Sequence, residues 1–291
     1  PPGHTADSIT KRASTTELAQ RLQLYPASQA MRLAALFCAL RDDPAWETAR
    51  DALARLEVQA RAVVADGLLD DLAPQFQGEA WLLLARIVHR GLGHHPDPGR
   101  ARQTIRDAVV AARALLTVTS ELEETFALAA VAAERKEDAL AAWDDAVAFF
   151  RPRAAELMEG TLLDNERRAL AVALLERART LDGLGRRDDA IAAARDALAV
   201  QDSAASGTAA QMLALLIRML QAGGDVAGAR ALIDASREGL VEHDPDFADA
   251  LVSLLRVTDE LPLARALLER ALRRFPGDPR LADARRELAP R

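Results

Sequence analysis

Cysteine and aromatic residues are scarce in this chain, and each scarcity narrows the structures that it can form. Cys38 is the only cysteine, so neither an intrachain disulfide nor a thiolate metal cluster is possible. Aromatic residues make up 4% of the sequence, so a core must be built mainly from Ala, Leu and Val. Ala and Leu favour helices, whereas sheets prefer β-branched and aromatic residues. The composition therefore favours an all-α protein.

Long apolar runs and an excess of positive charge are also missing. No uninterrupted apolar stretch approaches the roughly 20 residues of a membrane-spanning helix, so we expect no membrane insertion. The formal net charge is −7 at pH 7, whereas a general nucleic-acid binder normally carries a basic face, so we expect no nucleic-acid partner. We expect a cytoplasmic protein. A periplasmic or secreted one is the alternative, because the chain begins with Pro1 rather than Met.

Familiar catalytic and metal-binding motifs are absent from the sequence. It contains no phosphate loop, nucleophile elbow, His-Glu-x-x-His helix or dinucleotide fingerprint. His89, His94 and His95 lie near Asp97 in the sequence. Zinc needs three or four ligands in a fixed geometry, however, which a His-Pro-Asp-Pro loop does not supply unaided. We expect no enzymatic activity, no metal and no cofactor.

Apolar residues recur at helical spacing from Thr15 onward, and no stretch alternates long enough to predict a sheet. Ser120 followed by Glu123 predicts a capping box at the start of one helix. Pro152 predicts a break between helices, with an additional helical segment over 152–163. The interruptions of the helical pattern lie at 42–44, 91–99, 119–120, 151–152, 185, 223–224, 243–245 and 276–279.

One arrangement of small apolar residues returns along the second half of the chain. Ala190, Ala229 and Ala264 each open an apolar stripe that follows a turn, at intervals of 39 and 35 residues. Each stripe is preceded by the stripe of another helix, so the unit is a helix hairpin. A single hairpin with such a small-residue face cannot bury enough apolar area alone, so neighbouring hairpins must stack. The pattern predicts a series of stacked helix hairpins.

This pattern resembles the tetratricopeptide repeat (TPR) family, whose unit is a pair of antiparallel helices of about 34 residues. The residues that carry the resemblance are Trp81, Leu84, Ala85 and Val88; Ala101, Ile105 and Ala108; Phe126, Ala127 and Ala130; Ala139, Trp143 and Ala146; Gly185 and Ala190; and Ala264, Leu268, Ala271 and Pro276. The resemblance implies a right-handed α-solenoid of antiparallel hairpins. It departs from the family at the long loop 91–99 and at the 51-residue interval between Ala139 and Ala190.

Composition and the match to the repeat together predict the organisation of the chain. Trp81 and Trp143 are expected to anchor the core. In the last helix, Leu281 and Leu288 are expected on the buried side, with Arg and Asp residues turned outward. The expected parts are a disordered leader at 1–14, a helical N-terminal portion of degenerate repeats or a cap at 15–77, TPR-like repeats at 78–276 and a C-terminal capping helix at 277–291.

In the TPR family, the first helix of each hairpin faces a concave groove that holds a peptide. The resemblance places Arg86, Arg179 and Arg218 at equivalent inward positions. Guanidinium groups bind carboxylates in bidentate geometry, so such a row favours an acidic segment or a free C-terminal carboxylate. The alternative is that these arginines merely cover exposed helix faces in an arginine-rich chain. The candidate partner-binding residues are Arg86, His89, Arg90, Arg179, Gln211, Arg218, Gln221, Asp249 and Arg256.

The resemblance thus predicts a non-enzymatic scaffold that binds an unknown protein or peptide in its groove. Two other functions stay open on fold analogy alone. One is the regulatory or sensor solenoid of a larger signalling or transcription-regulating protein. The other is an envelope protein that assists assembly or polysaccharide export. A homo-oligomer is also open, because the ends and convex faces of a solenoid can both self-associate.

Overall fold

The computed structural model describes residues 57–58, 60–61, 64, 74–156, 161–200, 207–233 and 239–288. Every regular element within these ranges is a helix, so the all-α prediction is confirmed for the described part of the chain. None of the helices described combines the length and apolar character needed to cross a membrane. The predicted leader at 1–14 and most of the portion at 15–77 lie outside the described residues.

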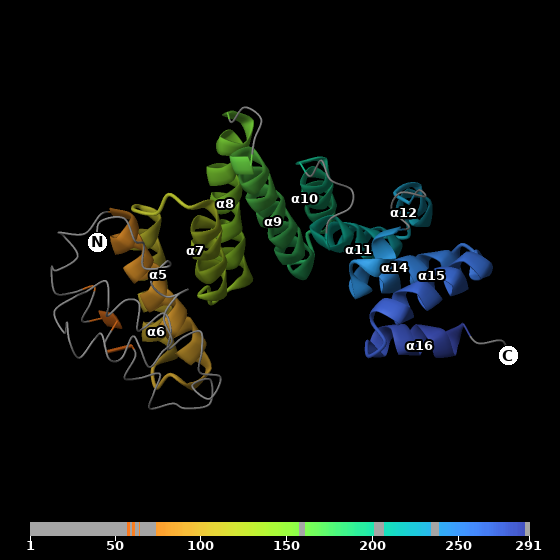
Figure 1. Cartoon of the computed structure of the whole chain (residues 1–291), viewed down its shortest axis with the longest axis horizontal. Coiled ribbons are helices and arrows are strands. Elements are labelled where there is room, and N and C mark those ends of the chain that lie inside the picture. Colours follow the sequence, from red (N-terminus) through yellow and green to blue (C-terminus); the bar gives the residue numbers. More distant parts are fainter. Residues whose placement is uncertain are drawn as a thin grey trace. The chain divides into compact units, whose positions relative to one another are not determined.

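The chain divides into two compact units, and their boundary in the sequence falls within one helix (Figure 1). Unit 1 covers Pro1–Ala142 and contains α5 (Pro74–Gly91), the 3-10 helix η2 (Leu92–His94), α6 (Pro98–Arg113), α7 (Thr119–Val131) and the start of α8 (Lys136–Glu156). Unit 2 covers Trp143–Arg291 and contains the rest of α8, α9 (Thr161–Gly183), α10 (Arg187–Val200), α11 (Gly207–Ala222), α12 (Val226–Ala231), η3 (Gly239–Glu242), α14 (Pro245–Val257), α15 (Leu261–Arg274) and α16 (Pro279–Glu287).

In unit 1, α5 packs against α6 and also against α7, and α6 packs against α7. Asp97 starts α6, because its side chain accepts a hydrogen bond from the backbone N–H of Arg100 at 2.9 Å. Gly78 lets α5 approach the link that follows α6, since a Cβ there would lie 2.9 Å from Cγ of Leu116. Trp81 is only half-buried, so it anchors this unit less completely than the sequence predicted.

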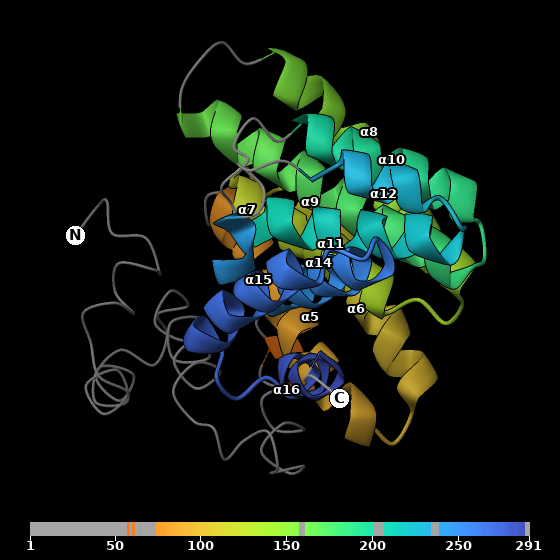
Figure 2. The ribbon, with the colours of Figure 1, turned by 90° about the vertical axis from the view of Figure 1, so that its right-hand side faces the viewer.

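In unit 2, each hairpin contacts the next one along the chain. Helix α9 packs against α10 and α11, α11 packs against α12 and α14, and α14 packs against α15 and α16 (Figure 2). We call α9, α11, α14 and α16 the first helices of unit 2, and α10, α12 and α15 its second helices. In unit 1, α5 and α7 are the first helices and α6 is a second helix. Their contacts depend on small side chains: Ala178 on α9 and Ala190 and Ala194 on α10 are fully buried. Alanines at these positions let the two backbones approach closely.

Three turns within the hairpins of unit 2 have the same geometry. Gly185, Gly224 and Asp259 each adopt a positive φ, of 77°, 82° and 60°. In each case the next N–H donates to a carbonyl five residues back: Arg186 to Leu181 at 3.0 Å, Asp225 to Leu220 at 2.9 Å and Glu260 to Leu255 at 2.8 Å. This is the Schellman ending of a helix. The turns recur at intervals of 39 and 35 residues, like Ala190, Ala229 and Ala264.

Arginines on second helices bind the carbonyl end of the first helix of the following hairpin. The pairs are Arg106 with the carbonyl oxygen of Ala132, Arg187 with that of Ala222 and Arg265 with that of Leu288, each at 3.1 Å. The last carbonyls of a helix lack partners within it and carry the negative end of its dipole. A guanidinium at this place therefore stabilises the contact between one hairpin and the next.

The predicted helix break at Pro152 is wrong. Helix α8 continues through Pro152 to Glu156, so residues 152–156 complete α8, whereas residues 161–163 belong to the start of α9. Arg153, directly after the proline, binds Glu166 of α9 with Nη2–Oε1 at 2.9 Å and lies over the ring of Phe149. Phe150 is fully buried. These tertiary contacts outweigh the loss of one backbone hydrogen bond at the proline.

The predicted capping box at Ser120 is also wrong. Helix α7 begins at Thr119, so Ser120 lies within its first turn and Val118 is the N-cap residue, with no side-chain cap. Thr119 is buried. The burial of Thr119 therefore determines where α7 begins, although no capping side chain is available at that position.

Candidate partner-binding surface

Helix α11 is buried on every side but one. It contacts α9, α10, α12 and α14, and those neighbours cover most of its circumference. The side chains of α11 that stay at least partly exposed share one stripe at helical spacing: Thr208, Gln211, Leu215, Arg218, Gln221 and Ala222. Arg218 is the only charged residue of this helix. The stripe is the part of α11 that a partner can reach.

The neighbouring first helices expose the same stripe when they are aligned on Leu181, Leu220 and Leu255, the residues that close the three Schellman turns. Three positions, counted from each leucine, are at least partly exposed on all three helices. They are nine residues before it (Val172, Gln211 and Asp246), two residues before it (Arg179, Arg218 and Ser253) and one residue after it (Asp182, Gln221 and Arg256). All nine are partly or fully exposed. We call these nine residues the first-helix surface. The same face of α9, α11 and α14 therefore stays accessible.

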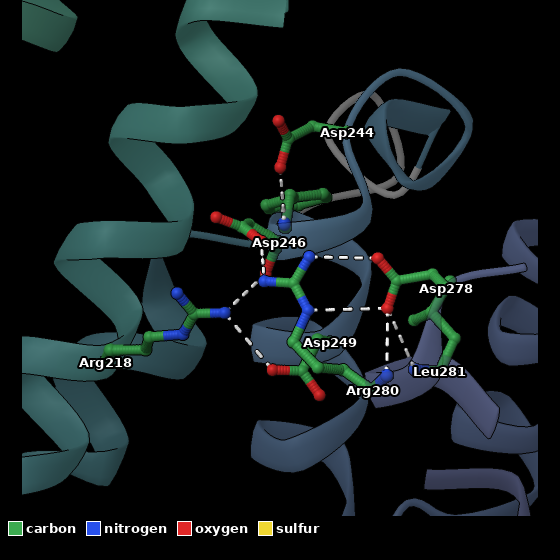
Figure 3. Close-up of polar contacts among 8 residues, drawn as sticks. Arg218, Asp244, Asp246, Asp249, Asp278, Arg280 and Leu281 are labelled. Atoms are coloured by element: carbon green, nitrogen blue, oxygen red, sulfur yellow. Dashed lines mark hydrogen bonds and ion pairs between the residues drawn. The ribbon is translucent and has the colours of Figure 1, made fainter. Parts of the chain in front are cut away.

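Arg218 and Arg280 approach the start of α14 from two different helices (Figure 3). Nη2 of Arg218 lies 3.1 Å from Oδ2 of Asp249 and 3.2 Å from the carbonyl oxygen of Asp246. Arg280, in the first turn of α16, binds the carboxylate of Asp246 and that of Asp278, the latter with Nη2–Oδ2 at 2.9 Å. The carboxylates therefore join α11, α14 and α16 in one charged network.

This network also moves the pKa values of its members. Hydrogen bonds to Asp278 raise the pKa of Arg280, so this guanidinium stays charged at any physiological pH. The hydrogen bond from Arg280 lowers the pKa of Asp278, and the backbone N–H groups of Leu281 and Arg280 lower it further. Asp278 is the N-cap of α16, where a carboxylate also interacts favourably with the helix dipole. One aspartate thus both starts the helix and holds Arg280.

Two further arginines link a first helix to the next first helix. Arg256 of α14 forms an ion pair with Glu287 of α16. In unit 1, Arg86 of α5 binds Glu124 of α7 through both of its carboxylate oxygens, with Nε–Oε1 at 2.6 Å. These arginines already bind carboxylates of this chain, so an acidic partner would have to displace Glu287 or Glu124 to reach them.

The remaining predicted residues of unit 1 lie at the end of α5. Arg90 is exposed, and His89 is half-buried. Burial lowers the pKa of His89, and the charge of Arg90 lowers it further. The Nδ1 atom of His89 is buried and has no hydrogen-bond partner within the described residues.

The histidines considered for metal binding do not form a metal site in the described residues. His95 accepts a hydrogen bond at Nδ1 from the N–H of Asp97 at 3.0 Å, and its Nε2 lies 3.5 Å from Glu57. Both of its ring nitrogens therefore face protein groups. No group of three or more His, Cys, Asp or Glu in the described part of the chain is placed to hold a metal ion.

A cleft of about 280 Å³ lies between α14 and α16. Its lining residues are Asp249, Val252, Ser253, Arg256, Arg280, Asp283, Ala284, Glu287 and Leu288. Sequence reasoning identified Asp249 and Arg256 but missed Arg280 and Glu287, because the last helix was interpreted only as a cap. The signal for them was a set of charged side chains on the outward side of α16. The cleft extends the first-helix surface onto this helix.

Six of the nine predicted partner-binding residues lie in unit 2 on or beside the first-helix surface: Arg179, Gln211, Arg218, Gln221, Asp249 and Arg256. The other three, Arg86, His89 and Arg90, lie on α5 in unit 1. No protein-family model matches the chain, and no curated protein is significantly similar to it in sequence.

Proposed function

We propose that this chain is a non-enzymatic binding module in which the first-helix surface holds a peptide or a segment of another protein. The observation that carries the proposal is the recurrence of one exposed stripe, in the same register, on α9, α11 and α14. We further propose that the hairpins form a TPR-like α-solenoid. This is supported by the 39- and 35-residue spacing of the turns and by the contact of each first helix of unit 2 with the next one in that unit.

The chemistry of the surface suits a polypeptide ligand. Within the described residues, the side-chain amides of Gln211 and Gln221 make no hydrogen bond. An amide both donates and accepts, so it can pair with the main chain of an extended segment. Leu215 lies between them on the same stripe and is partly exposed, so it offers an apolar contact. The two amides and Leu215 can therefore bind the main chain and one apolar side chain of a peptide, and none of the three is a catalytic group.

Peptide selection and site-directed cross-linking together test this function. A random peptide library is selected against the full chain, and the enriched peptides are then incubated with chains that carry a photo-crosslinking amino acid in place of Gln211. The matched control carries the same amino acid in place of Arg195, which is exposed on α10. We expect cross-linking at position 211 and much less at position 195.

Replacing Gln211 and Gln221 together by alanine should weaken the selected peptides by about tenfold, since two hydrogen bonds are worth roughly 1.5 kcal/mol together. Arg195→Ala should leave their binding unchanged. Equal cross-linking at positions 211 and 195, or no enriched peptide at all, would show that the first-helix surface is not a binding site.

A further inference from the structure

The arginines of the first-helix surface differ in what they bind. Arg218 reaches from α11 to Asp249 of α14, and Arg256 reaches from α14 to Glu287 of α16. Arg179, at the same position of its helix as Arg218, instead pairs with Glu176 three residues earlier on α9 itself. The side chain of Arg179 is also exposed, at 41% of its full area. The series of ion pairs between successive first helices is therefore interrupted between α9 and α11.

The repeat register explains this interruption. Asp249 lies six residues before Leu255, and the residue six before Leu220 on α11 is Ala214. Ala214 has no carboxylate, and α11 as a whole contains no acidic residue. Arg179 therefore has no counterpart on the next first helix, although α9 and α11 are in contact.

We propose that the missing carboxylate is supplied by the ligand: Arg179 recognises an acidic side chain of a peptide bound across α9 and α11. This inference rests on the proposed function and names the chemistry of its partner. An exposed ion pair between residues three apart on one helix is weak, so a ligand carboxylate displaces Glu176 at little cost. A guanidinium can hold that carboxylate through two parallel hydrogen bonds.

Other features of the same surface favour a peptide over a phosphate backbone. Glu176 and Asp182 flank Arg179 on α9 and are both at least partly exposed, so they repel a continuous line of phosphates. The carboxylates of a peptide lie on flexible side chains, so one of them can bind Arg179 while any others turn away from Glu176 and Asp182. On α11, Gln211 and Leu215 then meet the main chain and an apolar side chain of the same ligand.

Fluorescence anisotropy with a labelled oligoglutamate peptide tests the inference on the full chain at low ionic strength, with oligoglutamine as the uncharged comparison. We expect oligoglutamate to bind more tightly than oligoglutamine, and added salt to weaken it. Arg179→Gln should weaken the binding of oligoglutamate by about fivefold. Arg179→Lys should weaken it by less, since lysine keeps the charge but cannot form two parallel hydrogen bonds to one carboxylate. Arg195→Gln on α10, which changes the charge equally, should bind as the wild type does.

A second variant tests the same idea in the opposite direction. Asp249→Ala removes the carboxylate that engages Arg218 and so creates a second interruption, which should tighten oligoglutamate binding by about fivefold. Asp145→Ala, on the exposed side of α8, changes the net charge equally and should not. Circular dichroism confirms that each variant is folded.

The results separate the two proposals. Wild-type affinity in Arg179→Gln, no gain in Asp249→Ala, or no preference for oligoglutamate over oligoglutamine would overturn the role of Arg179. Peptides selected from the library and cross-linked at position 211 would still support the binding surface in each of these cases. If those peptides instead cross-link equally at position 195, the proposed function itself is wrong.

Discussion

The guanidinium of Arg230 on α12 holds both carboxylate oxygens of Glu260, the residue that precedes α15, with Nε–Oε1 at 2.8 Å and Nη2–Oε2 at 3.0 Å. The hydrogen bonds from Arg230, and a further one from the hydroxyl of Thr258, lower the pKa of Glu260. This pair joins one hairpin to the turn of the next. Its contribution to stability therefore depends on the ionisation of Glu260.

The stabilisation that ionised Glu260 contributes should disappear at acidic pH. Because the folded state has the lower pKa, this contribution is present above the unfolded pKa of about 4.3 and disappears as the pH falls through the folded value. Glu260→Gln should therefore destabilise the chain by about 0.5 kcal/mol at neutral pH, as is usual for a partly exposed pair. In strong acid, its midpoint of chemical denaturation should match that of the wild type. A difference that persists at the lowest pH would show that the charge is not the cause.

Asp259→Gly should stabilise the chain. Asp259 adopts a φ of 60°, where Gly185 and Gly224 stand in the two equivalent turns. A side chain in this left-handed region costs about 1 kcal/mol, which glycine avoids. We expect a gain of that order in the free energy of unfolding by urea titration. Asp259→Val should lose more than the glycine gains, and a destabilised Asp259→Gly would mean that the aspartate side chain itself supports the turn.

Gly78→Ala should destabilise unit 1. The added Cβ would lie 2.9 Å from Cγ of Leu116 and 3.1 Å from its backbone nitrogen, and backbone cannot move aside as a side chain can. Overpacking of this kind costs about 1–3 kcal/mol. Gly93→Ala is the matched control, since a Cβ there meets nothing within 4 Å. Thermal unfolding of the two variants should differ, and equal melting temperatures would show that α5 can shift without cost.

The two tryptophans of the resemblance should differ when truncated. Trp143 is 8% exposed and therefore buried, whereas Trp81 is half-buried. Trp143→Ala should cost about 3–5 kcal/mol, the range for a large buried aromatic, and Trp81→Ala should cost less. Urea denaturation monitored by circular dichroism measures both. A larger loss at Trp81 would contradict the burial that the structure shows.

Much of the helical pattern could be predicted from residue spacing. The turns at Gly185 and at Gly223–Gly224, and the boundaries at 243–245 and 276–279, lie where glycine, proline and aspartate end or begin a helix. Such signals act through backbone conformation within a few residues, so they are readable locally. Pro152 was misread because its effect on α8 was outweighed by contacts with residues distant in sequence, among them Glu166.

The binding surface could be predicted only in part. The resemblance to the TPR family indicated Arg179, Gln211 and Arg218, and helical periodicity explains why such residues share one face of a helix. It could not indicate that Arg218 meets Asp249, because that pairing depends on how α11 and α14 pack against each other.

The sequence by itself determined an all-helical chain, the turns of its hairpins and which residues share a helix face, because helix propensity and periodicity act over a few residues. Only the tertiary structure decided which charges are neutralised. Carboxylates engage Arg86, Arg218 and Arg256 on the following first helix, whereas Arg179 pairs on its own helix. The physical reason is that an ion pair requires two side chains within a few ångströms, and packing between helices sets that distance.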